Sequence, residues 1–192
     1  MDKFLDSFFS YLEDIQNLSN PSKEKLSNLC SRVRLNKNER LQEIGRTCKT
    51  IYFVEEGAAR IFYYKDGIEI TEYFAFEKDL IIRAESLFYN QPSKKGITCM
   101  EDTNFIAIPS QPLFELFNQH HDLERLFRKL IQNAYVETVR RIEMIQFHTA
   151  EERYLSLLQN NPQVIQKVPL KFIASYLGIT QVSLSRIRST LA

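Results

Sequence analysis

A stretch near the C-terminus combines side chains that can bind the edges of nucleic-acid bases. When residues 181–191 are placed on a helix at 100° per residue, the small, polar and basic side chains share one face. This face consists of Gln181, Val182, Ser185, Arg186 and Ser189. Arginine can bind guanine through two hydrogen bonds, glutamine can do the same to adenine, and serine or threonine at a helix start can meet phosphate. An ordinary solvated face is the alternative, but it leaves the small outward residues unexplained.

The other face of this helix is apolar and predicts a partner helix just before it. Leu184, Ile187 and Leu191 form the inner stripe, and Thr180 is a good N-cap. The preceding apolar residues also recur at helical spacing, and they are Leu170, Ile173, Ala174 and Leu177. Pro169 suits the first turn of that helix, and Gly178 stands where it should end in a left-handed residue. Two helices joined by a glycine turn predict a helix-turn-helix.

Residues 173–188, IASYLGITQVSLSRIR, closely resemble the DNA-binding helices of the Crp/Fnr family of bacterial transcription regulators. The resemblance implies that Gln181, Val182 and Arg186 contact bases and that Thr180 and Ser183 lie near phosphates. Arg188, at the edge of the apolar stripe, is expected to reach a phosphate or its own domain. The best-known members carry glutamate at the position of Val182, and because valine cannot bind cytosine, a thymine methyl is the better partner here. The family's domain continues into a β-hairpin wing, which this sequence, ending at Ala192, does not include.

Composition fits a globular protein with a basic C-terminal end. The chain has 192 residues, 44% of them hydrophobic and 26% charged, with a net charge of +1. Residues 160–192 contain four basic residues and no acid, which leaves 21 basic and 24 acidic residues, about −3, in the first 159. A basic end suits contact with phosphates. Because no apolar run approaches the length of a membrane span, we expect a cytoplasmic protein without a membrane partner.

Neither a metal site nor a catalytic site is predicted. Cys30, Cys48 and Cys99 are far apart and lack metal-ligand spacing, so they are expected to be small buried hydrophobes. The family's oxygen sensors hold iron and sulfur with a cysteine cluster that this sequence lacks. No nucleophile with a base and an orienting group emerges, and no glycine-rich phosphate loop is present. We therefore expect no cofactor and no enzymatic activity.

The middle of the sequence predicts antiparallel strands. Residues 51–54, 58–64 and 68–74 are rich in β-branched and aromatic side chains, and Glu56-Gly57 and Asp66-Gly67 mark the turns between them. A short strand at 80–82 and a pair within 97–108 bring the number to about eight, which predicts a small β-barrel or jelly roll. Residues 52–60 resemble the cyclic-nucleotide-binding barrel of the same family. An amphipathic helix at 4–15 and a second short helix after Asn20-Pro21-Ser22 precede the strands, so the fold class is α+β. The aromatic face of the first helix is expected to pack on the domain that the strands form.

The resemblance weakens at the ligand pocket of that barrel. Family members that bind cyclic AMP carry a Gly-Glu-Leu segment and an Arg-Ser/Thr-Ala segment, and neither is present in residues 79–98. The side chains that could contact a ligand there are Arg83, Glu85, Lys94 and Lys95. A solvated loop is the favoured interpretation of these residues. We therefore expect no response to cyclic AMP and leave open whether an unknown small-molecule effector binds.

A long helix is predicted over residues 122–147, between the barrel and the helix-turn-helix. Its apolar residues cover a wide face and are Leu123, Leu126, Phe127, Leu130, Ile131, Ala134, Tyr135, Val139, Ile142 and Ile145. Such a face could contact both its own barrel and a second copy of the helix, so we interpret it as a dimerisation helix; a buried helix of a monomer is the alternative. Thr149 and Glu152 form a capping box that starts a further helix with Tyr154, Leu155 and Leu158 inside, and a hinge is expected at 148–150.

These observations predict three parts: a sensor-like domain at 1–121, a dimerisation helix and hinge at 122–148, and a helix-turn-helix DNA-binding domain at 149–192. The implied protein is a homodimeric transcription regulator that binds a palindromic site on double-stranded DNA. The serious alternative is a small-ligand-binding or protein-interaction module with a vestigial DNA-binding domain. Such a module would bind DNA without sequence preference and with little dependence on salt.

Overall fold

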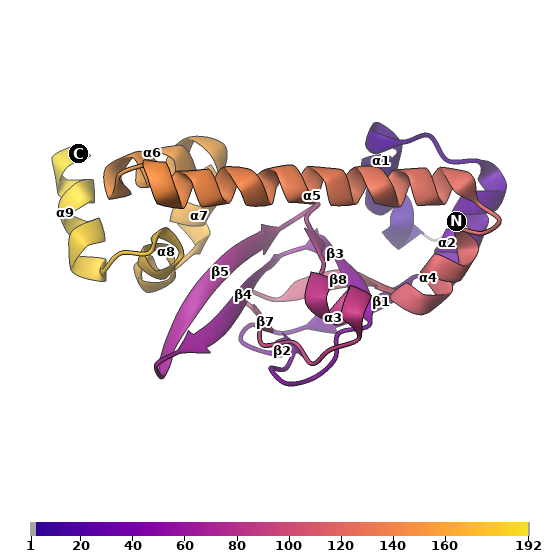
Figure 1. Cartoon of the computed structure of the whole chain (residues 1–192), viewed down its shortest axis with the longest axis horizontal. Helices are drawn as coiled ribbons and strands as arrows, with labels where there is room; N and C mark the ends of the chain where they lie inside the picture. Colours follow the sequence, from indigo (N-terminus) through magenta and orange to yellow (C-terminus); the bar gives the residue numbers. More distant parts are fainter. Residues whose placement is uncertain (1–2, 192) are drawn as a thin grey trace.

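The computed structural model describes residues 3–191 and is an α+β chain organised along one long helix. In Figure 1 this helix, α5 (His121–Phe147), spans the molecule, with the strands below it. The N-terminal helices lie at one end of α5 and the C-terminal helices at the other. The predicted fold class is confirmed. Residues 1, 2 and 192 of the predicted domains lie outside the described part of the chain.

Before α5, the described chain consists mainly of strands, with short helices before, between and after them. The elements before the strands are η1 (Lys3–Leu5), α1 (Asp6–Ile15) and α2 (Asn20–Leu29). The strands are β1 (Ser31–Leu35), β2 (Arg40–Gln42), β3 (Thr50–Glu56), β4 (Ala58–Lys65), β5 (Ile68–Phe76), β6 (Leu80–Ile81), β7 (Gly96–Cys99) and β8 (Thr103–Pro109). Helix α3 (Ala84–Tyr89) lies between β6 and β7, and α4 (Ser110–Leu116) follows β8. The helices after α5 are α6 (Ala150–Asn160), α7 (Pro162–Lys167), α8 (Leu170–Leu177) and α9 (Gln181–Leu191). Helices α3, α4 and α7 were not predicted.

The strands form two four-stranded antiparallel sheets in a jelly roll. One sheet has the order β1-β8-β3-β6 and the other β2-β7-β4-β5. Each sheet ends in a very short strand, β6 with two residues or β2 with three, so these edges offer little backbone for pairing across the gap. The strands do not close into a continuous barrel, and the predicted class, a small β-barrel or jelly roll, is confirmed.

The β4–β5 hairpin is the part of the jelly roll that contacts the C-terminal helices. Asp66 (φ 52°) and Gly67 (φ 76°) form its two-residue turn, and both have the positive φ that a type I′ turn requires. Further along, Ile61 lies opposite Tyr73 and Phe62 lies opposite Thr71. Glu72 is thus an extra residue in β5, which is a β-bulge.

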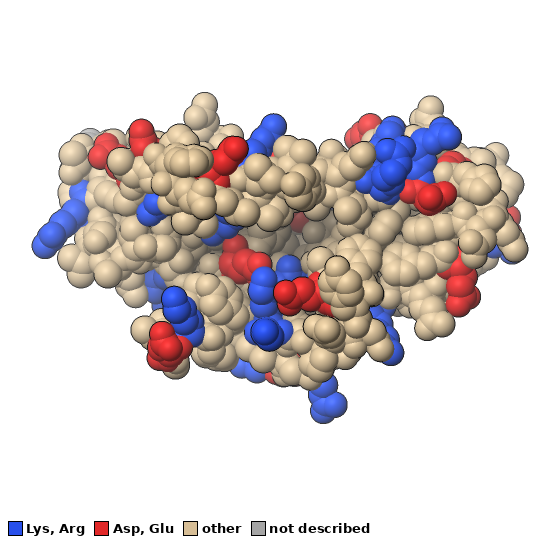
Figure 2. Space-filling view, viewed as in Figure 1, with Lys and Arg blue, Asp and Glu red and all other residues tan. Residues whose placement is uncertain are grey.

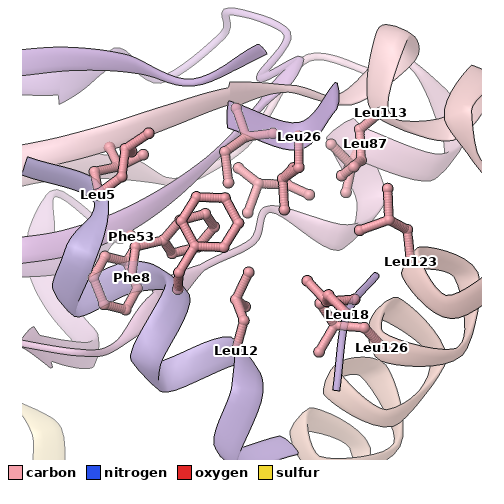
Figure 3. Close-up of a cluster of buried hydrophobic side chains, with 14 residues drawn as sticks. Leu5, Phe8, Leu12, Leu18, Leu26, Phe53, Leu87, Leu113, Leu123 and Leu126 are labelled. Atoms are coloured by element: carbon pink, nitrogen blue, oxygen red, sulfur yellow. The ribbon is translucent and has the colours of Figure 1, made fainter. Parts of the chain in front are cut away.

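The main core lies between the first sheet and the helices around it (Figure 3). The aromatic face of α1 packs on this sheet, with the rings of Phe8 and Phe53 5.1 Å apart. Leu123 and Leu126 at the start of α5 complete the cluster. The predicted packing of the first helix on the strands is confirmed, and it anchors one end of α5 to the jelly roll.

The C-terminal helices form a second core that includes residues of the β4–β5 hairpin. Ile173, Ala174, Leu177 and Leu184 are buried in it, together with Ala58, Phe74 and Phe76 of the strands. Two sequence assignments are wrong: Leu191 and Leu155 are exposed. Helix α9 extends past the core before it reaches Leu191. Leu157 takes the inner position in α6, because α7 covers that side of the helix.

Candidate nucleic-acid interface

A glycine turn joins α8 to α9. Gly178 has φ +70°, the left-handed conformation that a side chain disfavours. Its N–H donates to the carbonyl of Ser175 at 3.1 Å, and Ile179 N–H donates to the carbonyl of Ala174 at 3.0 Å. These two bonds are the Schellman motif, which ends a helix and redirects the chain. The predicted left-handed glycine is confirmed, whereas Pro169 lies one residue before α8 and not in its first turn.

Thr180 fixes the start of α9. Its Oγ1 accepts a hydrogen bond from the backbone N–H of Ser183 at 3.1 Å and lies 2.9 Å from the hydroxyl of Ser183. One of the free N–H groups at the helix start is thereby satisfied. Leu184 is fully buried against α8, which sets how α9 lies on its partner helix. The N-cap predicted at Thr180 is confirmed.

The predicted contact residues lie on an exposed surface, which we name the outer face of α9. It consists of Gln181, Val182, Ser185, Arg186 and Ser189, all exposed, with Val182 61% accessible. Ser189 donates its hydroxyl hydrogen to the backbone carbonyl of Ser185 at 3.0 Å, so only its oxygen remains for a ligand. Arg188 is also exposed, while Ser183 is half-buried beside Thr180. The face can therefore offer one guanidinium, one amide and a methyl surface to a groove of DNA.

Part of the basic charge near the C-terminus is used within the molecule. Lys167 forms an ion pair with Glu101 at 2.9 Å, which joins α7 to the loop before β8. Lys171 lies with its ammonium 4.7 Å from the centre of the Phe172 ring. Arg186 and Arg188 on α9 are the basic side chains of this region that remain exposed on the predicted DNA-contacting helix.

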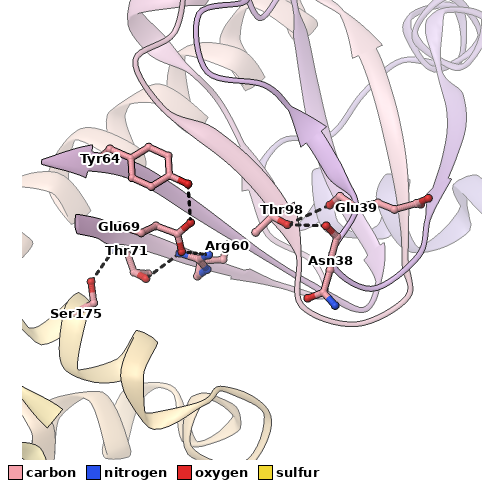
Figure 4. A network of polar contacts seen from close by, with 8 residues as sticks. All are labelled: Asn38, Glu39, Arg60, Tyr64, Glu69, Thr71, Thr98 and Ser175. Atoms are coloured by element: carbon pink, nitrogen blue, oxygen red, sulfur yellow. Dashed lines mark hydrogen bonds and ion pairs between the residues drawn. The ribbon is translucent and has the colours of Figure 1, made fainter. Parts of the chain in front are cut away.

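The helix-turn-helix packs against the jelly roll through α8 (Figure 4). The backbone N–H of Thr71 in β5 donates to the hydroxyl of Ser175 at 2.8 Å. Arg60 is only 4% accessible, and its guanidinium lies 3.9 Å from the centre of the Phe172 ring. Arg60 also donates to Glu69 at 2.6 Å and to the hydroxyl of Thr71 at 3.2 Å. Burial lowers the pKa of Arg60, and the ion pair with Glu69 opposes that effect.

Helix α5 also contacts α8, through Arg141 and Tyr176. Arg141 donates to the backbone carbonyl of Tyr176 at 2.8 Å, and its guanidinium lies 3.7 Å from the centre of the tyrosine ring. Tyr176 also packs on Phe74 of β5, with ring centres 5.1 Å apart. Sequence patterns did not predict these contacts, because Arg60, Arg141 and Ser175 lie far apart in the chain.

The four candidate ligand residues do not form one open site. Arg83 and Lys95 both pair with Glu72, at 3.2 Å and 2.5 Å. Burial alone would raise the pKa of Glu72, but Arg83 and Lys95 hold it below its ordinary value. Glu85 and Lys94 are exposed on neighbouring segments. Arg83 and Lys95 thus belong to an ion-pair cluster with Glu72 of β5, a partner that the sequence did not indicate. Figure 2 shows acidic and basic side chains close together below the long helix.

The remaining candidate chemistry is limited. Cys48 and Cys99 are buried and Cys30 is half-buried, and burial raises the pKa of the Cys99 thiol to about 11. Within residues 3–191, no group of three or more histidine, cysteine or carboxylate side chains could hold a metal ion. The helices in this part of the chain also include none with the length and apolar character needed to cross a membrane.

Known proteins share this architecture. Residues 32–120 match the family described as cyclic nucleotide-binding domain. FixK2 from Bradyrhizobium japonicum is similar in structure, with a TM-score of 0.70, 18% identity and 84% of each chain covered. The c-di-GMP responsive global regulator CLP from Xanthomonas campestris has a TM-score of 0.70 and 16% identity, over 90% of this chain and 91% of that one. No curated protein sequence matches the chain.

A third similar structure carries the family name that the sequence suggested. It is described as a transcriptional regulator of the Crp/Fnr family from Eubacterium rectale, with a TM-score of 0.69, 18% identity, and 97% of this chain and 86% of that one covered. Residues 32–120 are thus similar to a cyclic nucleotide-binding domain, and the chain shares its fold with these solved structures. The resemblance noted in residues 173–188 and 52–60 is confirmed at the level of fold.

Proposed function

We propose that this chain is a DNA-binding transcription regulator of the Crp/Fnr type, in which α9 enters the major groove. The observation that carries the proposal is the exposed outer face of α9, held by a capped helix-turn-helix. In such motifs the second helix contacts base edges. Arg186 would bind guanine, Gln181 adenine, and Val182 the methyl group of thymine. Thr180, Ser183 and Arg188 would lie near phosphates.

The regulator would act as a homodimer on a palindromic site. Several apolar side chains of α5 are exposed beyond the part that packs on the jelly roll, and they are Tyr135, Val136, Ile142, Ile145 and Phe147. Side chains of this kind on a long helix are suited to contact a second copy of that helix. A palindromic site has two half-sites about 34 Å apart, so the two α9 helices of the dimer must be held at that distance. The proposed parts are residues 1–121, 122–148 and 149–192, and the proposed location is the cytoplasm.

Cyclic AMP is not the proposed effector. A buried cyclic phosphate needs a fixed cationic partner, and Arg83 and Lys95 are already paired with Glu72. Lys94 is an exposed point charge without the two-pronged geometry of a guanidinium. Any other small-molecule effector would act by favouring one arrangement of the two α9 helices through α5 and the segment at His148 and Thr149.

Selection of preferred sites from random DNA, followed by affinity measurements on the selected site and on random DNA, tests the proposal. Arg186→Ala should cost about 1–3 kcal/mol on the selected site and should relax the preference at one base pair of each half-site. The matched control is Arg188→Ala, which should weaken both kinds of DNA alike, as expected for a phosphate contact.

Two outcomes would contradict the proposal. Equal losses for Arg186→Ala on selected and random DNA would exclude a base contact by this residue. Weak wild-type binding without sequence preference would favour the other candidate, a ligand-binding or protein-interaction module with a vestigial DNA-binding domain.

A further inference from the structure

The extra residue in β5 lies next to the contact between the jelly roll and the helix-turn-helix. Glu72 has no partner opposite it in β4, because Ile61 pairs with Tyr73 and Phe62 pairs with Thr71. Thr71, its neighbour, donates its backbone N–H to Ser175 of α8. Strand β5 is at the edge of its sheet, so an N–H group that points away from β4 has no strand partner.

The side chain of Glu72 is held in place by two cations from other segments. Arg83 stands at the start of α3, and Lys95 precedes β7. Both reach the Glu72 carboxylate, and the three side chains are partly buried, with 14–35% of their surface exposed. Partial burial strengthens such pairs relative to surface pairs, because less water screens the charges.

A change of register in β5 would move everything that α8 contacts. If the bulge closed, Glu72 would take the place of Thr71 opposite Phe62, and the residues toward Ile68 would shift by one. A one-residue shift turns each side chain of a strand to the opposite face. The hydrogen bonds of Arg60 to Thr71 and Glu69 would be lost with it, and so would the bond from Thr71 to Ser175.

We propose that the ion pairs of Glu72 with Arg83 and Lys95 hold the β5 bulge, and that the bulge presents Thr71 to α8, so that this charge cluster controls packing of the helix-turn-helix on the jelly roll. The outer face of α9 stays exposed in the packed arrangement, so the contact sets the orientation of α9 and does not cover it. Only the consequence for DNA rests on the proposed function. The packing itself does not.

Amide hydrogen exchange of Thr71, followed by nuclear magnetic resonance in the full chain, tests the proposal. Ser175→Ala removes the acceptor and should speed exchange of the Thr71 amide by about three- to tenfold, the factor that one net hydrogen bond represents. Glu72→Gln keeps the size of the side chain but removes its charge, and it should speed the same amide by a similar factor. The matched control is Glu85→Gln, which removes an exposed carboxylate beside Arg83 and should leave Thr71 unchanged.

A second pair of variants guards against general loosening of the fold. Lys95→Met removes one cation and leaves Arg83 paired, whereas Lys94→Met changes the exposed neighbour. Phe105 is buried in the core, so faster exchange of its amide in Glu72→Gln would indicate general loosening. In that case, Lys95→Met would still support the proposal if it sped exchange at Thr71 but not at Phe105. If Glu72→Gln loosens the core and Lys95→Met leaves the exchange of Thr71 unchanged, the proposal is overturned.

Two other results would also overturn the inference. One is normal protection of Thr71 in Glu72→Gln together with fast exchange in Ser175→Ala. The other is equal exchange of Thr71 in the wild type and in Ser175→Ala, because the contact would then be absent in solution. On DNA, Glu72→Gln and Ser175→Ala should change the affinity in the same direction, and opposite directions would refute the link. A protein that binds no DNA would refute the proposed function, while the exchange of Thr71 would still decide this inference.

Discussion

Replacing Gly178 with alanine should weaken the helix-turn-helix without any steric clash. Gly178 has φ +70°, and nothing lies within 4 Å of the position that a Cβ would occupy. The cost is therefore that of the left-handed conformation alone, about 1–2 kcal/mol for a residue with a side chain. Alanine also restricts the unfolded chain, which offsets about 0.4–1 kcal/mol. We expect a net loss of about 1 kcal/mol in the free energy of unfolding.

Two other glycines separate conformational strain from collision. Gly45 has φ +84° and open space around its Cβ position, so Gly45→Ala should cost about as much as Gly178→Ala. At Gly57, φ is +99° and a Cβ would lie 2.7 Å from the backbone oxygen of Asp102 and from Thr103 Oγ1. Because backbone atoms must then move, Gly57→Ala should cost clearly more than the other two, beyond about 2 kcal/mol.

Urea unfolding of the three variants and the wild type measures these costs, provided that the slope with urea stays constant. Gly178→Ala should also weaken binding to the selected DNA site, because strain at the turn changes how α9 lies on α8. A neutral Gly178→Ala, or one as costly as Gly57→Ala, would refute the assignment of its cost to conformation alone. A destabilised Gly178→Ala with unchanged DNA affinity would show that the turn does not set the orientation of α9.

Further predictions concern the dimer, acid stability and the pocket. Replacing both Ile142 and Ile145 with lysine should make the protein sediment as a monomer with greatly reduced DNA affinity. The control Glu143→Lys should have neither effect. A wild-type protein that stays monomeric on DNA would contradict this prediction. Hydrogen bonds from Ser22 and Ser19 outweigh burial and lower the pKa of Asp122 to about 2. Its stabilising effect should be complete above about pH 4 and lost as the pH falls through 2, so Asp122→Asn should flatten acid unfolding curves in that window. Calorimetry should detect no binding of cyclic AMP at micromolar concentration, and binding that Lys95→Ala abolishes would be the contrary result.

Local sequence signals predicted the helix-turn-helix because each of its features is encoded within a few residues. The glycine at 178, the threonine cap at 180 and the buried Leu184 depend on spacing that a single helix imposes. The capping box of Thr149 and Glu152 was predicted for the same reason and is present. The Asp66-Gly67 turn likewise needs only two residues with positive φ.

Contacts between distant segments could not be predicted in this way. Glu72 looks like one polar residue of an alternating strand, and nothing nearby indicates that it leaves the register to meet Arg83 and Lys95. Arg60 lies in a predicted strand with no local signal of burial, yet it is buried because Phe172, over a hundred positions later, covers it. The prediction that Leu155 and Leu191 are buried was wrong for the converse reason: helical spacing identifies an apolar stripe but not where the neighbouring core ends.

Helix α8 is held from two sides, and this constrains how any signal could reach α9. Arg141 ties Tyr176 to α5, while Thr71 of β5 contacts Ser175 and Arg60 of β4 contacts Phe172. All three contacted residues lie on α8, the helix against which Leu184 positions α9. When α5 shifts relative to the jelly roll, α8 cannot keep its contacts with both. Movement of α5 must therefore break one set, and the set that breaks decides whether α9 follows α5 or the jelly roll.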